Sequence, residues 1–129
     1  MIKALPIQSK EEQEIICNHC GAEYDADLMA YEVVMEDKLI GVCQFTIDGR
    51  GGSLRCLSQV HGSDDTQAMF VLGRATLNFI DLCGIKTAYY DGADAEKLDG
   101  LLRLIGFKKT DGEYKVDLEH FFEHPCQHS

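Results

Sequence analysis

The sequence predicts an α+β domain with a mixed β-sheet: an antiparallel meander plus a parallel strand pair with flanking helices. Three β-rich runs lie between residues 31 and 60 and are separated only by short polar turns, which is typical of a meander. Residues 66–83 carry apolar side chains at three- and four-residue steps, and this spacing predicts a long amphipathic helix. The run 86–90 follows as a strand, so a right-handed crossover makes it parallel to the strand before the helix.

Two shorter helices and a hairpin complete the expected order of elements. Ser9 and Glu12 form a capping box, which predicts a helix over residues 10–20. An apolar stripe that stops at a glycine predicts another helix over residues 95–105. An Asp-Gly pair between two β-rich runs predicts a hairpin over residues 107–118.

Composition limits the classes of function. Residues 1–129 have the length of one domain, with residues 119–129 as a C-terminal tail whose Phe121 and Phe122 dock onto the body. The 12 basic and 22 acidic residues give a net charge of −10, which disfavours nucleic acid and anionic membranes as partners. No apolar run approaches the roughly 20 residues of a membrane span. With no signal-peptide pattern, we expect a cytoplasmic protein.

Three local motifs occur in a recognisable order. A β-rich run closes at Val60, Gly73-Arg74-Ala75 lies within the beginning of the long helix, and Leu104-Ile105-Gly106-Phe107 ends the last helix. The order of elements, together with these motifs, resembles the GNAT (Gcn5-related N-acetyltransferase) superfamily in a short form. The resemblance covers about residues 10–118.

This resemblance implies a reaction and a set of contacts. Members of the superfamily transfer an acetyl or other acyl group from acetyl-CoA or another acyl-CoA to an amine, so the implied partner is a small-molecule or peptide amine. In such proteins one strand splays from its neighbour, and backbone N–H groups at a helix N-terminus hold the diphosphate. The cofactor-binding residues implied here, with Arg74 as the side chain for phosphate, are Val60, Leu72, Gly73, Arg74 and Asn78.

Several positions depart from the superfamily pattern. Val71 stands where the resemblance implies a second loop glycine, and Leu102 stands where members often carry a tyrosine acid. Asp64 and Asp65 place negative charge before the long helix, which suits a helix cap and opposes a phosphate. A non-catalytic GNAT-fold binding or regulatory protein therefore remains open beside the acyltransferase.

Three residues are candidates for proton transfer. His61 follows the strand that closes at Val60, and Asp91 and Tyr90 lie at the end of the strand after the long helix. Each also has a structural interpretation: a solvated loop histidine, a turn aspartate before glycine, and a packing tyrosine.

A further acidic group lies near the first helix. Such a group attracts a cationic amine or forms an ordinary solvated face, and both interpretations stay open. Its members are Glu11, Glu12, Glu14, Glu23, Asp25 and Asp27.

The cysteine pattern suggests a third function class. Cys17 and Cys20 form a C-x-x-C pair in the last turn of the first helix, where the helix dipole raises a thiol pKa and disfavours redox catalysis. Either they are ordinary thiols, or they bind a metal with ligands from the tail, such as His124 and Cys126. A homodimer joined at sheet edges is one assembly that this architecture allows.

Overall fold

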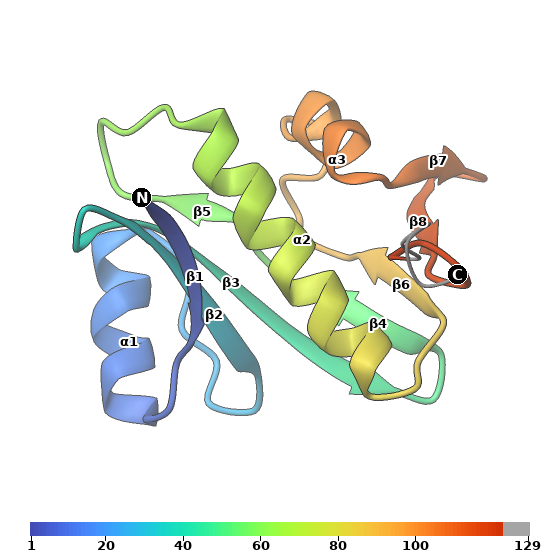
Figure 1. Cartoon of the computed structure of the whole chain (residues 1–129), viewed down its shortest axis with the longest axis horizontal. Helices are drawn as coiled ribbons and strands as arrows, with labels where there is room; N and C mark the ends of the chain where they lie inside the picture. Colours follow the sequence, from blue (N-terminus) through green and yellow to red (C-terminus); the bar gives the residue numbers. More distant parts are fainter. Residues whose placement is uncertain (123–129) are drawn as a thin grey trace, which may run out of the picture.

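The computed structural model describes residues 1–122, which fold into an eight-stranded sheet with three helices (Figure 1). The strand order is β1-β2-β3-β4-β6-β8-β7, and β5 pairs only with β3. The elements are β1 (Ile2–Pro6), α1 (Lys10–His19), β2 (Met29–Met35), β3 (Lys38–Asp48), β4 (Gly51–Leu54), β5 (Ser58–Gln59), α2 (Thr66–Leu82), β6 (Thr87–Tyr90), α3 (Asp99–Ile105), β7 (Lys108–Thr110) and β8 (Glu113–Asp117).

The predicted fold class is confirmed. Strands β2, β3 and β4 form the antiparallel meander, and β6 pairs in parallel with β4 after the crossover through α2. The final hairpin places β8 between β6 and β7. The sheet is therefore mixed, as the strand–helix–strand pattern predicts.

The two faces of the sheet carry different cores, because successive side chains of a strand point to opposite faces. Val42 of β3 packs with Cys17 and Cys20 of α1 in a small cluster. Phe45, on the opposite face of β3, belongs to the main core under α2 and α3. Figure 1 shows α2 running across this second face, while α1 lies beside β1 and β2.

Three elements differ from the sequence expectation. The third β-rich run, expected over residues 53–60, is divided into β4 and β5 by residues 55–57. Strand β1 is not predicted by the pattern, because it is a short edge strand with Pro6 at its end and little alternation. The helix expected over 95–105 is α-helical only from Asp99, since the preceding residues form turns and Leu98 at the N-cap makes no capping side-chain hydrogen bond.

Phe121 and Phe122 pack against the main core, which confirms their expected docking. Their rings lie 4.8 Å apart in an edge-to-face arrangement. Within residues 1–122, no helix is long and apolar enough to cross a membrane.

Candidate functional site

The parallel strands β4 and β6 separate at their carboxyl ends. Residues 52–54 pair with residues 88–90, and the N–H of Asp91 donates to the carbonyl of Leu54 at 2.8 Å. Beyond this point the chain bends away through Arg55, Cys56 and Leu57, and β5 pairs with β3 alone. The two strands therefore diverge at the sheet position where ligands of open α/β sheets commonly bind.

The divergence leaves a backbone edge open on β5. The N–H of Val60 donates to the carbonyl of Ile40 at 2.8 Å, so residue 60 belongs to a hydrogen-bonded pair. Because such pairs alternate in an antiparallel ladder, the N–H and C=O of Gln59 point away from β3. These two backbone groups of Gln59 face the side of the sheet on which β6 no longer pairs with the chain.

A cavity of about 320 Å³ lies beside this divergence. It is bounded by the segment after α1, the middle of β3, the bend between β4 and β5, and the loop after β6. Three carboxylates and one guanidinium are among its lining residues, which are Gly21, Ala22, Glu23, Asp25, Leu28, Gln44, Arg55, Cys56, Ser58, Ala93 and Asp94.

Two buried amides fix the wall of this cavity. Gln13 of α1 and Gln44 of β3 are 1% and 2% exposed, and Gln13 Nε2 donates to Gln44 Oε1 at 2.9 Å. Gln44 Nε2 donates to the carbonyl of Glu23 at 2.8 Å, and its Oε1 accepts from the N–H of Asp25 at 3.1 Å. This network holds the backbone of the segment after α1, because buried polar groups are costly to leave unpaired.

Asp94 is the acidic residue of the cavity nearest the end of β6. The hydroxyl of Tyr90 donates to Asp94 Oδ1 at 2.8 Å. Burial raises the pKa of Tyr90 well above its ordinary value, and the hydrogen bond to Asp94 acts in the same direction. The phenol therefore stays protonated and fixes the carboxylate in one orientation.

The three residues predicted for proton transfer do not meet at one point. His61 is exposed in the turn after β5, whereas Tyr90 is buried and points to Asp94. Asp91 binds Arg50 at 2.6 Å and accepts a hydrogen bond from Ser53. Its partial burial raises the pKa, but these bonds outweigh that effect and lower it, which makes Asp91 a weak base.

The structure places two of the expected cofactor contacts inside α2, which begins at Thr66, before the glycine motif. Gly73 is the eighth residue of the helix, and Leu72 and Gly73 are buried, with Gly73 packed against Ile105. Their N–H groups are used inside the helix. The backbone of Val60 is also used, since its N–H donates to Ile40 and its carbonyl accepts from Ser63.

Arg74 and Asn78 lie farther along α2. Arg74 Nε donates to the carbonyl of Ile105 at 2.6 Å, and its guanidinium lies 4.8 Å from the ring centroids of Phe70 and Phe121. At a rise of 1.5 Å per residue, Arg74 is about 12 Å and Asn78 about 18 Å from the helix start. Neither residue is at the end of α2 where a diphosphate could meet free N–H groups.

The cysteines of α1 behave as buried thiols. Burial raises the pKa of Cys17 to about 11 and that of Cys20 to about 12. Within residues 1–122, no group of three or more His, Cys, Asp or Glu side chains is arranged to hold a metal ion. The proposed tail ligands His124 and Cys126 lie outside the described residues, so the metal hypothesis stays a prediction.

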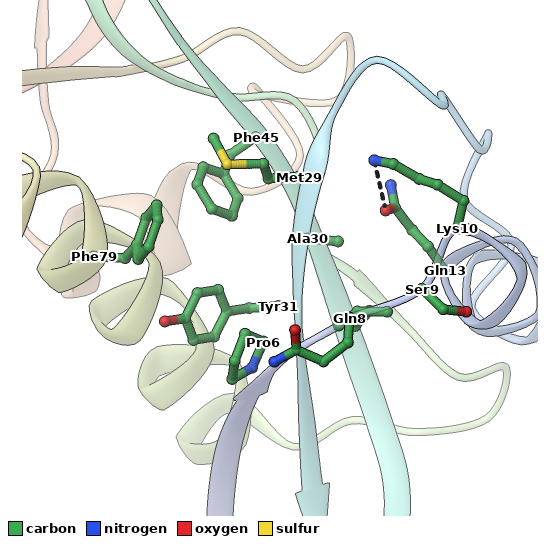
Figure 2. Close-up of a pocket in the computed structure, with 11 residues that line it drawn as sticks. Pro6, Gln8, Ser9, Lys10, Gln13, Met29, Ala30, Tyr31, Phe45 and Phe79 are labelled. Atoms are coloured by element: carbon green, nitrogen blue, oxygen red, sulfur yellow. Dashed lines mark hydrogen bonds between the residues drawn. The ribbon is translucent and has the colours of Figure 1, made fainter.

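A second cavity, of about 260 Å³, lies at the end of β1. Figure 2 shows the rings of Tyr31, Phe45 and Phe79 gathered on one side of β2, with Lys10 and Gln13 on the other. The ring centroids are 5.7 to 6.1 Å apart, so the three aromatic side chains pack mainly on one another. Gln13 lines this cavity and donates to Gln44 of the first one, so the amide pair connects the walls of the two cavities.

Sequence reasoning did not identify Gln13, Gln44 or Asp94. Gln13 lies on the apolar side of a helix, and Gln44 interrupts a nearly continuous apolar strand. A polar residue at a position that the pattern buries is the one signal that could have marked them. Asp94 lies in a polar loop and carried no such signal.

No protein-family model and no curated protein matches the sequence. Solved structures with a similar fold include an IAA acetyltransferase from Bacillus cereus (TM-score 0.72, 12% identity, covering 92% of this chain and 100% of that one). A Bacillus subtilis acetyltransferase in complex with CoA has a TM-score of 0.69 at 11% identity, covering 92% and 99%. The PaiA N-acetyltransferase of Thermoplasma acidophilum, in complex with coenzyme A, has a TM-score of 0.67 at 13% identity, covering 91% and 99%.

Proposed function

We propose that this chain, which has the GNAT fold, transfers an acyl group from a thioester to an amine bound in the 320 Å³ cavity. One observation carries the proposal: the divergence of β4 and β6 brings an open backbone edge at Gln59 next to a polar cavity. The structural neighbours described as acetyltransferases support the reaction class.

The acceptor that suits the cavity is a small cationic amine or an amine carried by a peptide. Glu23, Asp25 and Asp94 line it, opposed by Arg55. Because Arg55 Nε donates to Ser53 Oγ at 2.8 Å, part of its hydrogen-bonding capacity is already directed away from the cavity. An ammonium group would gain from these carboxylates at low ionic strength.

Asp94 is the proton acceptor in this proposal. The bound ammonium first gives one proton to solvent, and the neutral amine must lose a second as its C–N bond to the acyl carbon forms. The C–S bond breaks, and the thiolate leaves and takes a proton from solvent. The carboxylate of Asp94 takes the second amine proton, and the Tyr90 hydroxyl at 2.8 Å holds the carboxylate in place. Tyr90 is thus a positioning residue, since it acts through Asp94.

Coenzyme A fits this chain in part. The open edge at Gln59 suits an extended amide-containing arm, which could bond to it as an added strand. The diphosphate does not fit, because the N–H groups at the glycine motif are inside α2 and a carboxylate caps the helix start. A non-catalytic amine-binding protein is therefore the second candidate, favoured by this cap.

The test measures acylated amine by mass spectrometry, with acetyl thioesters as donors and a panel of a polyamine, lysine and a short peptide. We expect turnover with at least one amine, and Asp94→Asn should lower kcat by about 10²-fold or more. Asp111→Asn, the same change in a distant turn, should leave kcat unchanged.

One result would decide against the enzyme, and another against the role of Asp94. Absence of acylated product with every donor and amine contradicts acyl transfer. If calorimetry then detects amine binding that weakens in Asp94→Asn, the non-catalytic alternative is supported. Equal kcat in the wild type and in Asp94→Asn would remove Asp94 as the proton acceptor.

A further inference from the structure

The start of α2 is closed by the chain itself. The side chain of Asp65 accepts the N–H of Ala68 at 2.9 Å, and the N–H of Asp65 donates to Gln59 Oε1 at 3.0 Å. The N–H of Ser63 closes a turn onto the carbonyl of Val60 at 2.9 Å. A helix N-terminus binds an anion through free N–H groups and its dipole, and here a carboxylate of the protein already occupies that place.

Charge and packing also act against a bound diphosphate there. Asp64 is exposed beside Asp65, and the first cation along α2 is Arg74, which is engaged with Ile105. Met69, in the first turns of α2, is fully buried and packs over Gly41 of β3, where an added Cβ would lie 2.6 Å from its sulfur. The helix is therefore seated directly on the sheet at this end.

The backbone edge of β5 at Gln59 is open, whereas the start of α2 is closed. The N–H and C=O of Gln59 point away from β3, and no described residue bonds to them. Such an edge can pair with an extended chain that alternates amide N–H and C=O groups. The pantetheine arm of an acyl thioester is a chain of this kind.

We infer, on the basis of the proposed function, that the acyl donor is recognised through its amide-containing thiol arm alone, without its diphosphate and nucleotide. The chain then accepts acyl-pantetheine thioesters about as well as acyl-CoA. This assignment rests on two observations, the open backbone edge at Gln59 and the carboxylate-capped start of α2.

Calorimetry with coenzyme A, pantetheine and adenosine 3′,5′-bisphosphate tests the inference. We expect coenzyme A and pantetheine to bind with dissociation constants within about threefold of each other, and the bisphosphate to show no binding at millimolar concentration. Acetyl-CoA and acetyl-pantetheine should give kcat/KM values equally close. Binding of coenzyme A more than tenfold tighter than pantetheine would overturn the inference while leaving acyl transfer intact. If neither coenzyme A nor pantetheine binds, the inference and the proposed acyl transfer are both overturned.

Charge variants at the helix start give a second readout. Asp65→Ser keeps a capping oxygen but removes the charge, so coenzyme A should bind roughly three- to tenfold tighter while pantetheine binding stays constant. Asp111→Asn makes the same change in net charge far away and should alter neither. If coenzyme A binds more tightly by the same factor in both variants, the overall charge of the protein, and not the helix start, excludes the diphosphate.

A backbone variant tests the open edge directly. Gln59→Pro removes the outward N–H at a position where a strand edge tolerates proline, and Gln59→Ala keeps it. We expect binding of both thiols to weaken more than tenfold in Gln59→Pro and to stay within threefold in Gln59→Ala. Unchanged binding in a folded Gln59→Pro protein, checked by circular dichroism, would contradict the assignment of the arm to this edge.

Discussion

The two sides of the divergence between β4 and β6 are built in opposite ways. On the cavity side, buried neutral amides hold a polar segment in place and leave a space of about 320 Å³. On the α2 side, Met69 and Gly73 are buried, and a carboxylate closes the helix start. One backbone divergence is therefore bordered by a polar cavity on one side and by close packing on the other.

The energetics of the two sides also differ. Gln44 stabilises through directed hydrogen bonds, and their loss leaves the part-buried Asp25 N–H and Glu23 carbonyl without their side-chain partner. Gly73 stabilises by leaving room for Ile105, so its contribution depends on volume. Single substitutions can therefore disturb one side and spare the other.

The largest expected effect is on the cavity side. Gln44→Ala removes one of three acceptors of Gln13 Nε2 and the side-chain partner of the Asp25 N–H and the Glu23 carbonyl, and we expect the free energy of unfolding to fall by about 3 kcal/mol. Urea unfolding measures this change. Gln67→Ala, in an exposed position of α2, is the control and should stay within about 0.5 kcal/mol of the wild type. Equal stability of the two variants would contradict a structural role for the amide network.

A smaller effect is expected on the packed side. An added Cβ at Gly73 would overlap Ile105, with Cγ1 only 2.9 Å away, so Gly73→Ala should destabilise by about 1–2 kcal/mol despite the better helix propensity of alanine. Gly100→Ala in α3 meets no atom within 4 Å and should stabilise by about 0.5–1 kcal/mol. Ile105→Val should recover part of the loss in a double variant. The same sign of change at Gly73 and Gly100 would refute the close helix contact.

These contacts show where sequence reasoning succeeds. The meander, the long helix and the parallel strand depend on periodicity and turn residues, which are local, so they could be predicted and are confirmed. Strand β1 could not be predicted from the sequence, because this edge strand is defined mainly by its pairing with β2. The early part of the 95–105 segment is not helical, since it lacks a capping side chain.

The site was harder to predict, for two physical reasons. The cavity wall depends on Gln13 and Gln44, which are 31 residues apart and meet only in the fold. The resemblance implies phosphate contacts at Gly73, whereas the N-cap at Asp65 sets the helix start at Thr66, seven residues before that glycine.

The smallest expected effect concerns Asp91, at the end of the strand that bounds the divergence. Its side chain is 32% exposed, so solvent screens its ion pair with Arg50, which also binds Glu113 at 2.9 Å. Asp91→Asn should therefore lower the free energy of unfolding at pH 7 by at most about 1 kcal/mol.

The pH dependence of this loss has a definite sign. The pKa of Asp91 is lowered in the folded state, so its stabilisation is fully present above the ordinary aspartate pKa and is lost as pH falls through the lowered folded value. Urea unfolding at pH 7 and at pH 3 should show the wild type and Asp91→Asn converging at the lower pH. A difference that grows on acidification would mean that the carboxylate is not held in its charged form. A loss at pH 7 as large as that of Gln44→Ala would remove the contrast between buried amides and half-exposed charges.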